Sequence, residues 1–561
     1  MPKIQYRIAV VGEFLTENEE LRRRLSARLA EIRKNLDNQC EYQLCFLTPS
    51  EGLSSAWEGI RQEMGIDSLV LPTPQECTAG GEQIQGHARR MLVQISDLAD
   101  LVLGVWNEDP DGSEAYIWET LHRCMEKNVP CLWISEKDGA EYWAEQILFE
   151  PYQDGFLRAH LDALRVEEEW EAPVENLPWG NRVIDWGNRL YQRMLKNYAA
   201  VPGQEQSCED RLAEHEPFFS EEQAEAVRIR LLNAYQEYDS RALRLSERYR
   251  GSIYWRSILP MIATILLAIG FYADAVSQAV IDLLRIESGV PRFVFLLMSF
   301  AFFFHALMIL GSHLLARNRV IQSWHTHFLY CRMVAEILRF YVHIYPFGIT
   351  LPLNRILSKS GFDTTGSQPV YVRIWQILHD SGTGQPAYRE ANVPAFLDAM
   401  EQYLLSQLDY HKRSAARFQN LRNKLRKLET WLVSAGILTV ALRGIAQFFI
   451  IGVNKNLILL GSGLTLPSYS GSIANMCAMV IPAVASFYTG KLTLFGFEDS
   501  ISMSRLMEER LEKAIERVRS MKGRDVNYSM IRNLAEQIAI LVMGDVASWD
   551  QEIAKRKIKG L

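Results

Sequence analysis

The chain has 561 residues, 48% hydrophobic and 23% charged, which leaves room for several domains and excludes a transporter that is apolar along its whole length. Its formal net charge of -7 argues against a nucleic-acid partner, because no segment carries the excess of Lys and Arg that phosphate neutralisation needs. The eight cysteines include no CxxC pair and no histidine partners at zinc-ligand spacing, so we expect no metal and no cofactor.

Residues 1–135 alternate between strand and helix patterns. Short apolar runs rich in β-branched residues predict strands at 6–11, 42–47, 68–71, 101–106 and 130–134. Amphipathic stretches between them predict helices at 17–36, 83–98 and 113–127. Such alternation is typical of a Rossmann-like α/β domain with a parallel sheet. The chain enters its first strand without a basic segment and an apolar segment before it, so we expect this domain not to be exported.

Three loops at the carboxyl ends of these strands form the candidate ligand site, because parallel sheets bind ligands at that edge. Glycines there let the backbone approach a phosphate or ribose, serines suit helix N-caps, and a tryptophan can stack on a base. The candidates are Gly12, Glu13, Thr48, Ser50, Glu51, Gly52, Trp106, Asn107, Gly112, Ser113 and Glu114. The same residues also suit ordinary turns between strands and helices, and the pattern alone does not separate the two readings.

Two segments interrupt the regular patterns. Residues 136–219 are irregular and acidic, with several tryptophans and prolines, which indicates a connector with short helices. Residues 348–394 contain Ser, Thr, Gly and Pro and are interpreted as a linker. Between and after these segments lie two units, 220–347 and 395–561.

Each unit carries two apolar runs of about twenty residues. The runs lie at about 257–276, 293–315, 431–453 and 472–495. They are long enough to cross a hydrocarbon core of ~30 Å and are apolar nearly all round, so we predict four membrane spans in an all-α domain with long cytosolic helices. Aligning Tyr238 with Tyr410 also aligns Arg250 with Arg422 and the starts of the first and third spans. This indicates a duplicated module: basic helix, span, loop, span, helix.

Basic residues flank the spans on one side only. Arg and Lys precede the first and third spans and follow the second, whereas the loop after the third span has only Lys455. The positive-inside rule therefore predicts cytoplasmic N- and C-termini in a multi-pass protein embedded in the lipid bilayer.

Arg443 lies near the centre of the third span, with Gln447 one turn further along the same face. An arginine at mid-bilayer costs about 2.5–3.5 kcal/mol on insertion scales, so it should face protein or water. It is either a pore-lining or subunit-contacting charge, or a sign of a shifted span or of a structural hydrogen bond to a neighbouring helix.

Several segments resemble a bacterial family in which a SLOG-type Rossmann-like domain is joined to SLATT-like transmembrane units. In the α/β part they are DLADLVLGVWNEDPDGSEAYIWETLHRCMEKNVPCLWIS and LTPSEGLSSAW; in the membrane part they are ALRLSERYRGSIY, WHTHFLYCRMVAEILRF, SQLDYHKRSAARF and MVIPAVASFYTG. The chain departs from the family where a basic Gly-His-Arg turn is replaced by Gly12-Glu13-Phe14, where Gly-Gly-Thr is replaced by Gly112-Ser113-Glu114, and where Asn107 replaces Asp. Glu13 weakens the case for a highly charged phosphate at that turn.

The resemblance implies a nucleotide-derived second messenger as the ligand, and a homo-oligomeric effector of antiphage defence in the bacterial inner (cell) membrane. We therefore expect a nucleotide-gated effector that permeabilises or depolarises that membrane and is not an enzyme. A membrane-anchored enzyme that cleaves nucleotides at a glycosidic or phosphate bond is the alternative, with Glu13, Glu51 and Glu114 as its candidate carboxylates. A plain membrane scaffold is a third possibility.

Overall fold

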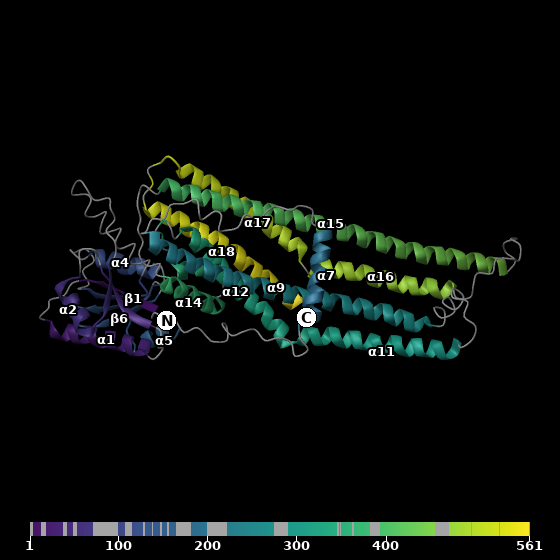
Figure 1. The fold of residues 1–561 in the computed structure, drawn as a ribbon, viewed down its shortest axis with the longest axis horizontal. Helices are drawn as coiled ribbons and strands as arrows, with labels where there is room; N and C mark the ends of the chain where they lie inside the picture. The colour runs from purple at the N-terminus through teal and green to yellow at the C-terminus, as the bar shows by residue number, and fades with distance from the viewer. Residues whose placement is uncertain are drawn as a thin grey trace.

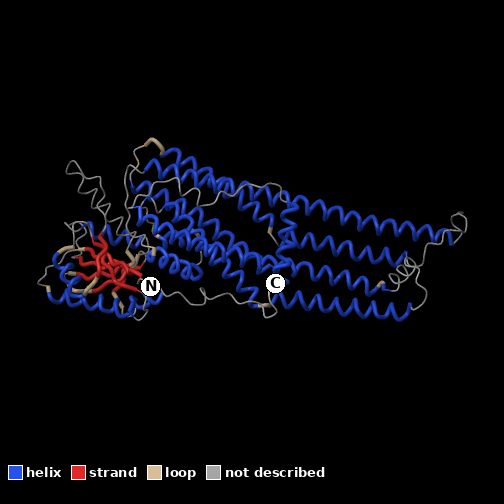
Figure 2. The backbone as a smooth tube through the Cα atoms, viewed as in Figure 1, coloured by secondary structure: helices blue, strands red, loops and turns tan. Residues whose placement is uncertain are grey.

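The computed structural model consists of an α/β domain at one end and an elongated helical part (Figure 1). It describes residues 4–12, 18–37, 42–48, 53–70, 99–106, 115–126, 129–136, 138–145, 148–153, 156–163, 181–198, 221–273, 290–344, 347, 349, 351–361, 364–381, 393–454, 470–494, 496–524, 526 and 528–559. Figure 2 shows that the strands are confined to the α/β end and that the rest of the described chain is almost entirely helical.

The α/β domain contains a mixed sheet in the order β3-β2-β1-β4-β5-β6-β7. The strands are β1 Ile4–Val11, β2 Tyr42–Thr48, β3 Asp67–Val70, β4 Leu101–Trp106, β5 Cys131–Ser135, β6 Glu141–Glu145 and β7 Leu148–Pro151. β1 to β5 pair in parallel, which confirms the predicted strands and their Rossmann-like arrangement.

The sheet is mixed because β6 and β7 add an antiparallel hairpin to its edge. These two strands lie beyond residue 135, in the segment whose irregular composition indicated a connector with short helices, so the sheet extends past the parallel strands that the sequence predicted. The hairpin is held by aromatic contacts: Trp133 of β5 stacks on Tyr142 with ring centroids 4.9 Å apart, and Trp143 packs edge-on against Tyr152.

Helices cover both faces of the sheet. α1 Glu19–Asp37, α2 Ser55–Met64 and α5 Phe156–Ala163 pack on the face that carries Ile8, whereas α4 Ala115–Glu126 packs on the face that carries Ala9. Two of the predicted helices correspond to α1 and α4, and the one expected at 83–98 lies outside the described residues. Because the chain winds in opposite directions from β1 and from β4, the switch point of the sheet lies between these two strands.

The helical part repeats one arrangement twice, in the predicted order. The first unit is α9 Glu221–Phe271, α11 Val290–Arg317 and α12 Arg319–Ile344; the second is α15 Val393–Asn454, α16 Ser470–Leu494 and α17 Phe497–Met521. α9 packs against α11 and α12, α15 packs against α16 and α17, and α16 also packs against α9. The last helix, α18 Tyr528–Lys559, packs against α12 and α17.

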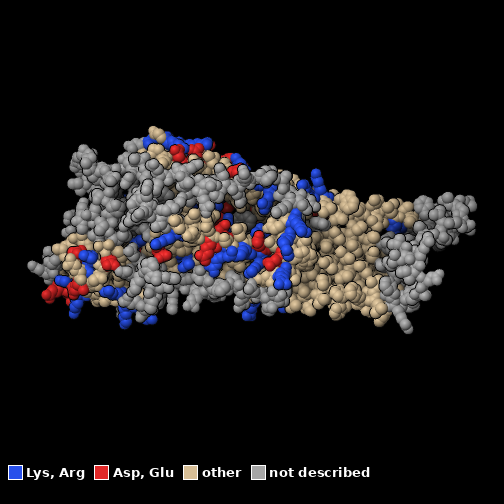
Figure 3. Space-filling model, viewed as in Figure 1, with Lys and Arg blue, Asp and Glu red and all other residues tan. Residues whose placement is uncertain are grey.

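One end of the helical part is apolar on its surface. Among the residues that the structure describes, three helices are long and apolar enough to cross a membrane, within Ile229–Phe271, Val294–Arg317 and Val393–Ala446. Phe295 and Phe448 are among the large apolar side chains exposed there, and Figure 3 shows this end largely without charged side chains. In α16 the described apolar stretch is the shorter Asn475–Ala485, so the fourth span stays a prediction.

Residues 353–380, inside the predicted linker, form two packed helices, α13 Leu353–Lys359 and α14 Thr364–Asp380. Val370 and Ile374 of α14 are fully buried in the main core of the helical part. Of the prolines that suggested a linker, Pro352 is the N-cap of α13, where the missing N–H costs nothing, and Pro369 lies inside α14.

Candidate functional site

The structure brings the carboxyl ends of β1, β2 and β4 together, because β1 lies between the other two strands. Gly12 follows β1 with φ +89°, a left-handed conformation that favours glycine. The indole N–H of Trp57, a buried residue of α2, donates to the Gly12 carbonyl over 2.8 Å. The backbone at the end of β1 is therefore fixed beside the switch point, where ligands bind in sheets of this kind.

The remaining candidates at this edge are not placed. Thr48 and Trp106 end β2 and β4, but their side chains are outside the described part of the chain. Eight further candidates also lie outside the described residues: Glu13, Ser50, Glu51, Gly52, Asn107, Gly112, Ser113 and Glu114. The ligand pocket stays a prediction that rests on the topology of the sheet.

Arg443 lies within α15, about 18 Å along the helix from Trp431. Its side chain is partly exposed, and its neighbours Leu442 and Ile445 are more than half exposed. The Gln447 side chain is outside the described residues. The chain by itself thus leaves Arg443 on a largely apolar surface, where water, lipid or another subunit would meet it.

A second site, which the sequence did not reveal, lies at the start of β4. The Asp100 carboxylate accepts a hydrogen bond from the backbone N–H of Arg7 in β1, 2.7 Å away. Its other oxygen accepts from the indole N–H of Trp375 in α14, and His379 Nε2 lies 3.0 Å from the first oxygen. Tyr6 packs edge-on against the Trp375 ring with centroids 6.3 Å apart. These contacts join the two central strands of the sheet to α14.

The Asp100 site is almost closed to water, since the side chains of His379 and Asp100 are 8% and 7% exposed. Burial lowers the pKa of the Arg7 guanidinium, and the charge of Asp100 opposes that shift. Burial also lowers the pKa of His379, with Arg7 acting in the same direction and Asp100 against it. His379 Nδ1 faces the Trp375 carbonyl at 2.7 Å and Nε2 faces Asp100, so only the imidazolium can donate to both. The protonation of His379 is therefore set by a balance between burial and its two acceptors.

The opposite side of α14 contacts α9. Arg373 Nε donates to the Tyr238 hydroxyl over 2.6 Å, and Arg230 Nη1 donates to the Asp380 carbonyl over 2.8 Å. α9 then continues without interruption into the first apolar stretch. α14 is thus the element through which β1 and β4 contact a membrane-capable helix (Figure 1).

A buried charged cluster lies deeper in the helical part. Glu336 of α12 pairs with both Arg332 and Arg339, and Arg332 also donates to Asp239 of α9 over 2.8 Å. Burial opposes ionisation of Glu336, but the two arginines outweigh it and lower the pKa of the carboxyl. Facing this cluster, His411 of α15 lies 3.9 Å from Asp545 of α18. Burial and the charge of Glu336 raise the pKa of Asp545 to about 7, and burial with Arg339 lowers the pKa of His411 to about 4.

Asp545→Asn is expected to gain stability relative to the wild type as the pH rises from about 4 to 7. The folded protein keeps the Asp545 proton up to about pH 7, whereas the unfolded chain releases it near 3.8, so the wild type loses stability across that window. His411 contributes the opposite slope, because the unfolded chain binds its proton near 6.5 and the folded protein only near 4. The substitution removes only the first contribution, on the order of 2–4 kcal/mol. Melting temperatures of both proteins in detergent from pH 4.5 to 7.5 measure the difference, and a difference independent of pH contradicts the assignment.

The hydrogen bonds of α14 to Asp100 on one side and to α9 on the other form one continuous path from the central strands of the sheet to α9. α14 thereby joins the α/β sheet to a membrane-capable helix. Comparisons of the chain with protein-family models, curated proteins and solved structures give no match, so the functional argument rests on the fold and these contacts.

Proposed function

We propose that the chain is a ligand-gated membrane effector. A nucleotide-derived second messenger binds at the carboxyl ends of β1, β2 and β4, and its binding energy favours one arrangement of α14 and α9 over another. The observation that carries the proposal is the Asp100 site, where the two strands that flank the switch point contact Trp375 and His379.

The path from the sheet through α14 to α9 is suited to transmitting a conformational change, because it consists of strands and helices. β1 and β4 carry the predicted ligand edge at one end and the Asp100 site toward the other. α14 is short and is held on both sides by hydrogen bonds to charged or aromatic side chains. α9 has 51 residues and spans about 76 Å as one helix, with Pro260 inside its apolar stretch, so a displacement at Tyr238 is carried along the helix to the start of that stretch. A ligand shifts this equilibrium only by its difference in affinity for the two arrangements.

The resemblance to SLOG and SLATT proteins supports the finer parts of the proposal. It favours a nucleotide signal, a role in antiphage defence and assembly into a homo-oligomer in the bacterial inner membrane. The basic flanks of the spans favour cytoplasmic termini. In an oligomer Arg443 would face a neighbouring subunit or a water-filled path, either of which meets its need for a polar surrounding.

Proteoliposomes that contain the full chain and a trapped dye test the proposal. Cyclic oligonucleotides and ADP-ribose-type ligands are added from outside, and at least one is expected to bind and to release the dye. Folded protein that binds a nucleotide without any permeability change overturns the effector proposal. Product chromatography of the same samples tests the enzyme alternative, because nucleotide turnover supports catalysis.

Trp375→Phe is expected to reduce ligand-triggered dye release about tenfold while leaving ligand binding intact. The substitution keeps an aromatic ring against Tyr6 but removes the N–H donated to Asp100, a charge-assisted bond of about 1.5–3 kcal/mol. Trp431→Phe, at an exposed position of α15, is the matched control and is expected to behave as the wild type. Equal dye release from both variants would show that the signal does not pass through Asp100.

A further inference from the structure

Helix α7, Arg182–Tyr198, crosses the helical part at the point where its apolar end begins (Figure 1). It packs very closely against α9 through two glycines. A Cβ on Gly251 would lie 2.3 Å from the carbonyl oxygen of Ile184, and a Cβ on Gly187 would lie 2.6 Å from the Trp255 ring. The Trp255 indole N–H also donates to the Val183 carbonyl over 2.7 Å. α7 is therefore fixed to α9, although its segment was expected to be part of a connector.

α7 also contacts the second repeat. Its buried Tyr191 packs in a cluster with Leu421 and Leu425 of α15 and with Phe497 at the start of α17. The helix thus spans from one repeat to the other. Its buried face, which includes Ile184 and Tyr191, is fully used in these contacts.

The outer face of α7 carries an arginine stripe, which we define as Arg182, Trp186, Arg189 and Arg193. These residues are spaced at i, i+4, i+7 and i+11, so they lie on one side of the helix. All four are exposed, and Trp186, 49% exposed, packs against the Trp255 ring with centroids 5.1 Å apart. Within the described part of the chain none of the three arginines forms an ion pair.

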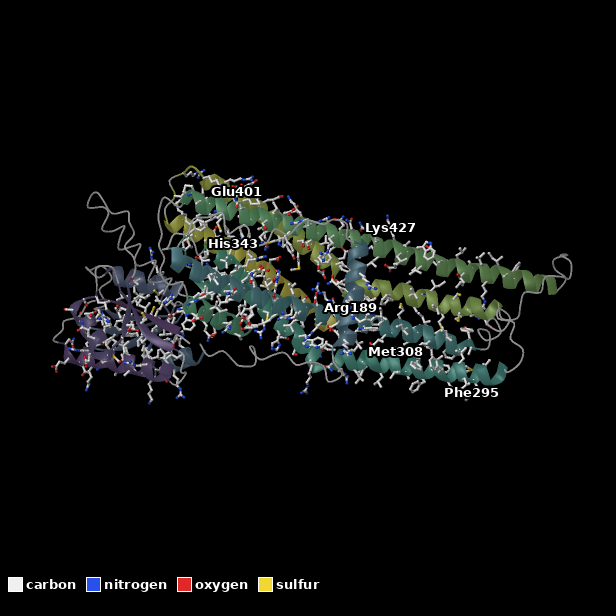
Figure 4. All side chains as sticks on the ribbon, viewed as in Figure 1. Arg189, Phe295, Met308, His343, Glu401 and Lys427 are labelled. Atoms are coloured by element: carbon white, nitrogen blue, oxygen red, sulfur yellow. The ribbon has the colours of Figure 1, made fainter. Side chains whose placement is uncertain are left out.

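The stripe lies level with the edge of the apolar surface. Trp255, which α7 contacts, is followed by Arg256, and from there α9 is apolar to Phe271. On the other repeat, Leu425 is followed by Arg426 and Lys427, and the exposed Trp431 comes one turn later. Figure 4 shows Arg189 and Lys427 near the start of the apolar end and Phe295 far along it.

We infer that the arginine stripe binds the headgroups of anionic phospholipids at the membrane surface. Its three guanidinium groups complement phosphate charge, and an exposed tryptophan among them is typical of the membrane interface. The position fits because the apolar surface that lipid tails would cover begins beside α7. The inference rests on a bilayer around α9, α11 and α15 and is independent of ligand gating.

Native mass spectrometry of the full chain in detergent, titrated with phosphatidylglycerol or phosphatidylcholine, tests the inference. The wild type is expected to bind phosphatidylglycerol more tightly than phosphatidylcholine. Because salt screens exposed charges, a preference that is unchanged in 0.5 M salt contradicts the charge-based account. The triple variant Arg182→Gln, Arg189→Gln, Arg193→Gln is expected to lose on the order of 100-fold in affinity for that lipid, since each of the three arginines near an anionic surface contributes about fivefold. The matched control replaces three exposed arginines away from the boundary, Arg244, Arg510 and Arg524, and is expected to bind as the wild type.

Three other outcomes overturn the inference. The first is that the triple Gln variant binds phosphatidylglycerol as tightly as the control does. The second is that glycerol 3-phosphate displaces the lipid at equal concentration, which would make the stripe a site for soluble anions. The third is that the triple Gln variant changes its oligomeric mass without lipid while its lipid binding is unaltered, which would assign the stripe to a contact between copies of the chain. If the triple Gln variant does not fold, replacing the same arginines by Lys must retain the preference, because the charge is kept.

Discussion

Replacing Asp100 by alanine is expected to reduce the local stability of β1 and α14 by about 3–5 kcal/mol. The substitution leaves the Arg7 charge buried without its neighbouring anion and leaves the N–H groups of Arg7 and Trp375 without an acceptor. Because the site is nearly closed to water, solvent cannot replace these partners. Amide hydrogen exchange of the full chain measures the change, and protection of β1 and α14 is expected to fall on the order of 100-fold or more.

Two further variants identify the cause of that loss. Asp100→Asn keeps one acceptor oxygen but no charge, so its loss of protection should be intermediate. Asp409→Ala removes an exposed ion pair with Arg413 on α15 and should cost no more than about 1 kcal/mol. If Asp100→Ala loses no more protection than Asp409→Ala, the site does not join the two parts of the molecule.

Gly251→Ala is expected to detach α7 from α9. Its new methyl group would meet a backbone carbonyl at 2.3 Å, and backbone cannot rotate away as a flexible side chain can. Overpacking of this kind costs about 1–3 kcal/mol or more, so protection of α7 amides from exchange should fall roughly 10- to 100-fold.

Gly444→Ala is the matched control within α15. A Cβ at Gly444 meets nothing within 4 Å, so this substitution should leave α7 unchanged and gain up to about 1 kcal/mol from helix propensity. Equal α7 protection in the two variants would mean that the close crossing of α7 and α9 does not hold in solution.

The elements that the sequence predicted are those with a strong local signal. β4 is a continuous apolar run, β5 is apolar up to its final Ser135, and β1 is apolar apart from Gln5 and Arg7, as strands covered on both faces of a sheet require. β6 and β7 have only five and four residues and carry glutamates, and they become strands because the edge of β5 gives them a partner. α14 begins with Thr364 and contains Pro369, which suggest a turn, although Val370 and Ile374 are spaced as a buried helical face requires.

The candidate ligand edge of the sheet and the Asp100 site also differ in how far the sequence predicts them. The carboxyl edge of the sheet could be predicted because every parallel sheet presents its strand ends there, whatever the loops contain. The Asp100 site could not, because its hydrogen bond to Trp375 joins residues 275 positions apart and exists only after α14 docks on β1. A single aspartate before a strand gives no signal of that partner.

The unbroken path of α9 also sets the distance between the α/β domain and the bilayer. Arg230 and Tyr238, which contact α14, lie about 39 Å and 27 Å along the helix from Arg256 at the edge of the apolar surface. That separation exceeds three Debye lengths of ~8 Å at physiological ionic strength. An anionic signal molecule would therefore reach the domain without repulsion from anionic lipids, and its association rate should not depend on the charge of the membrane.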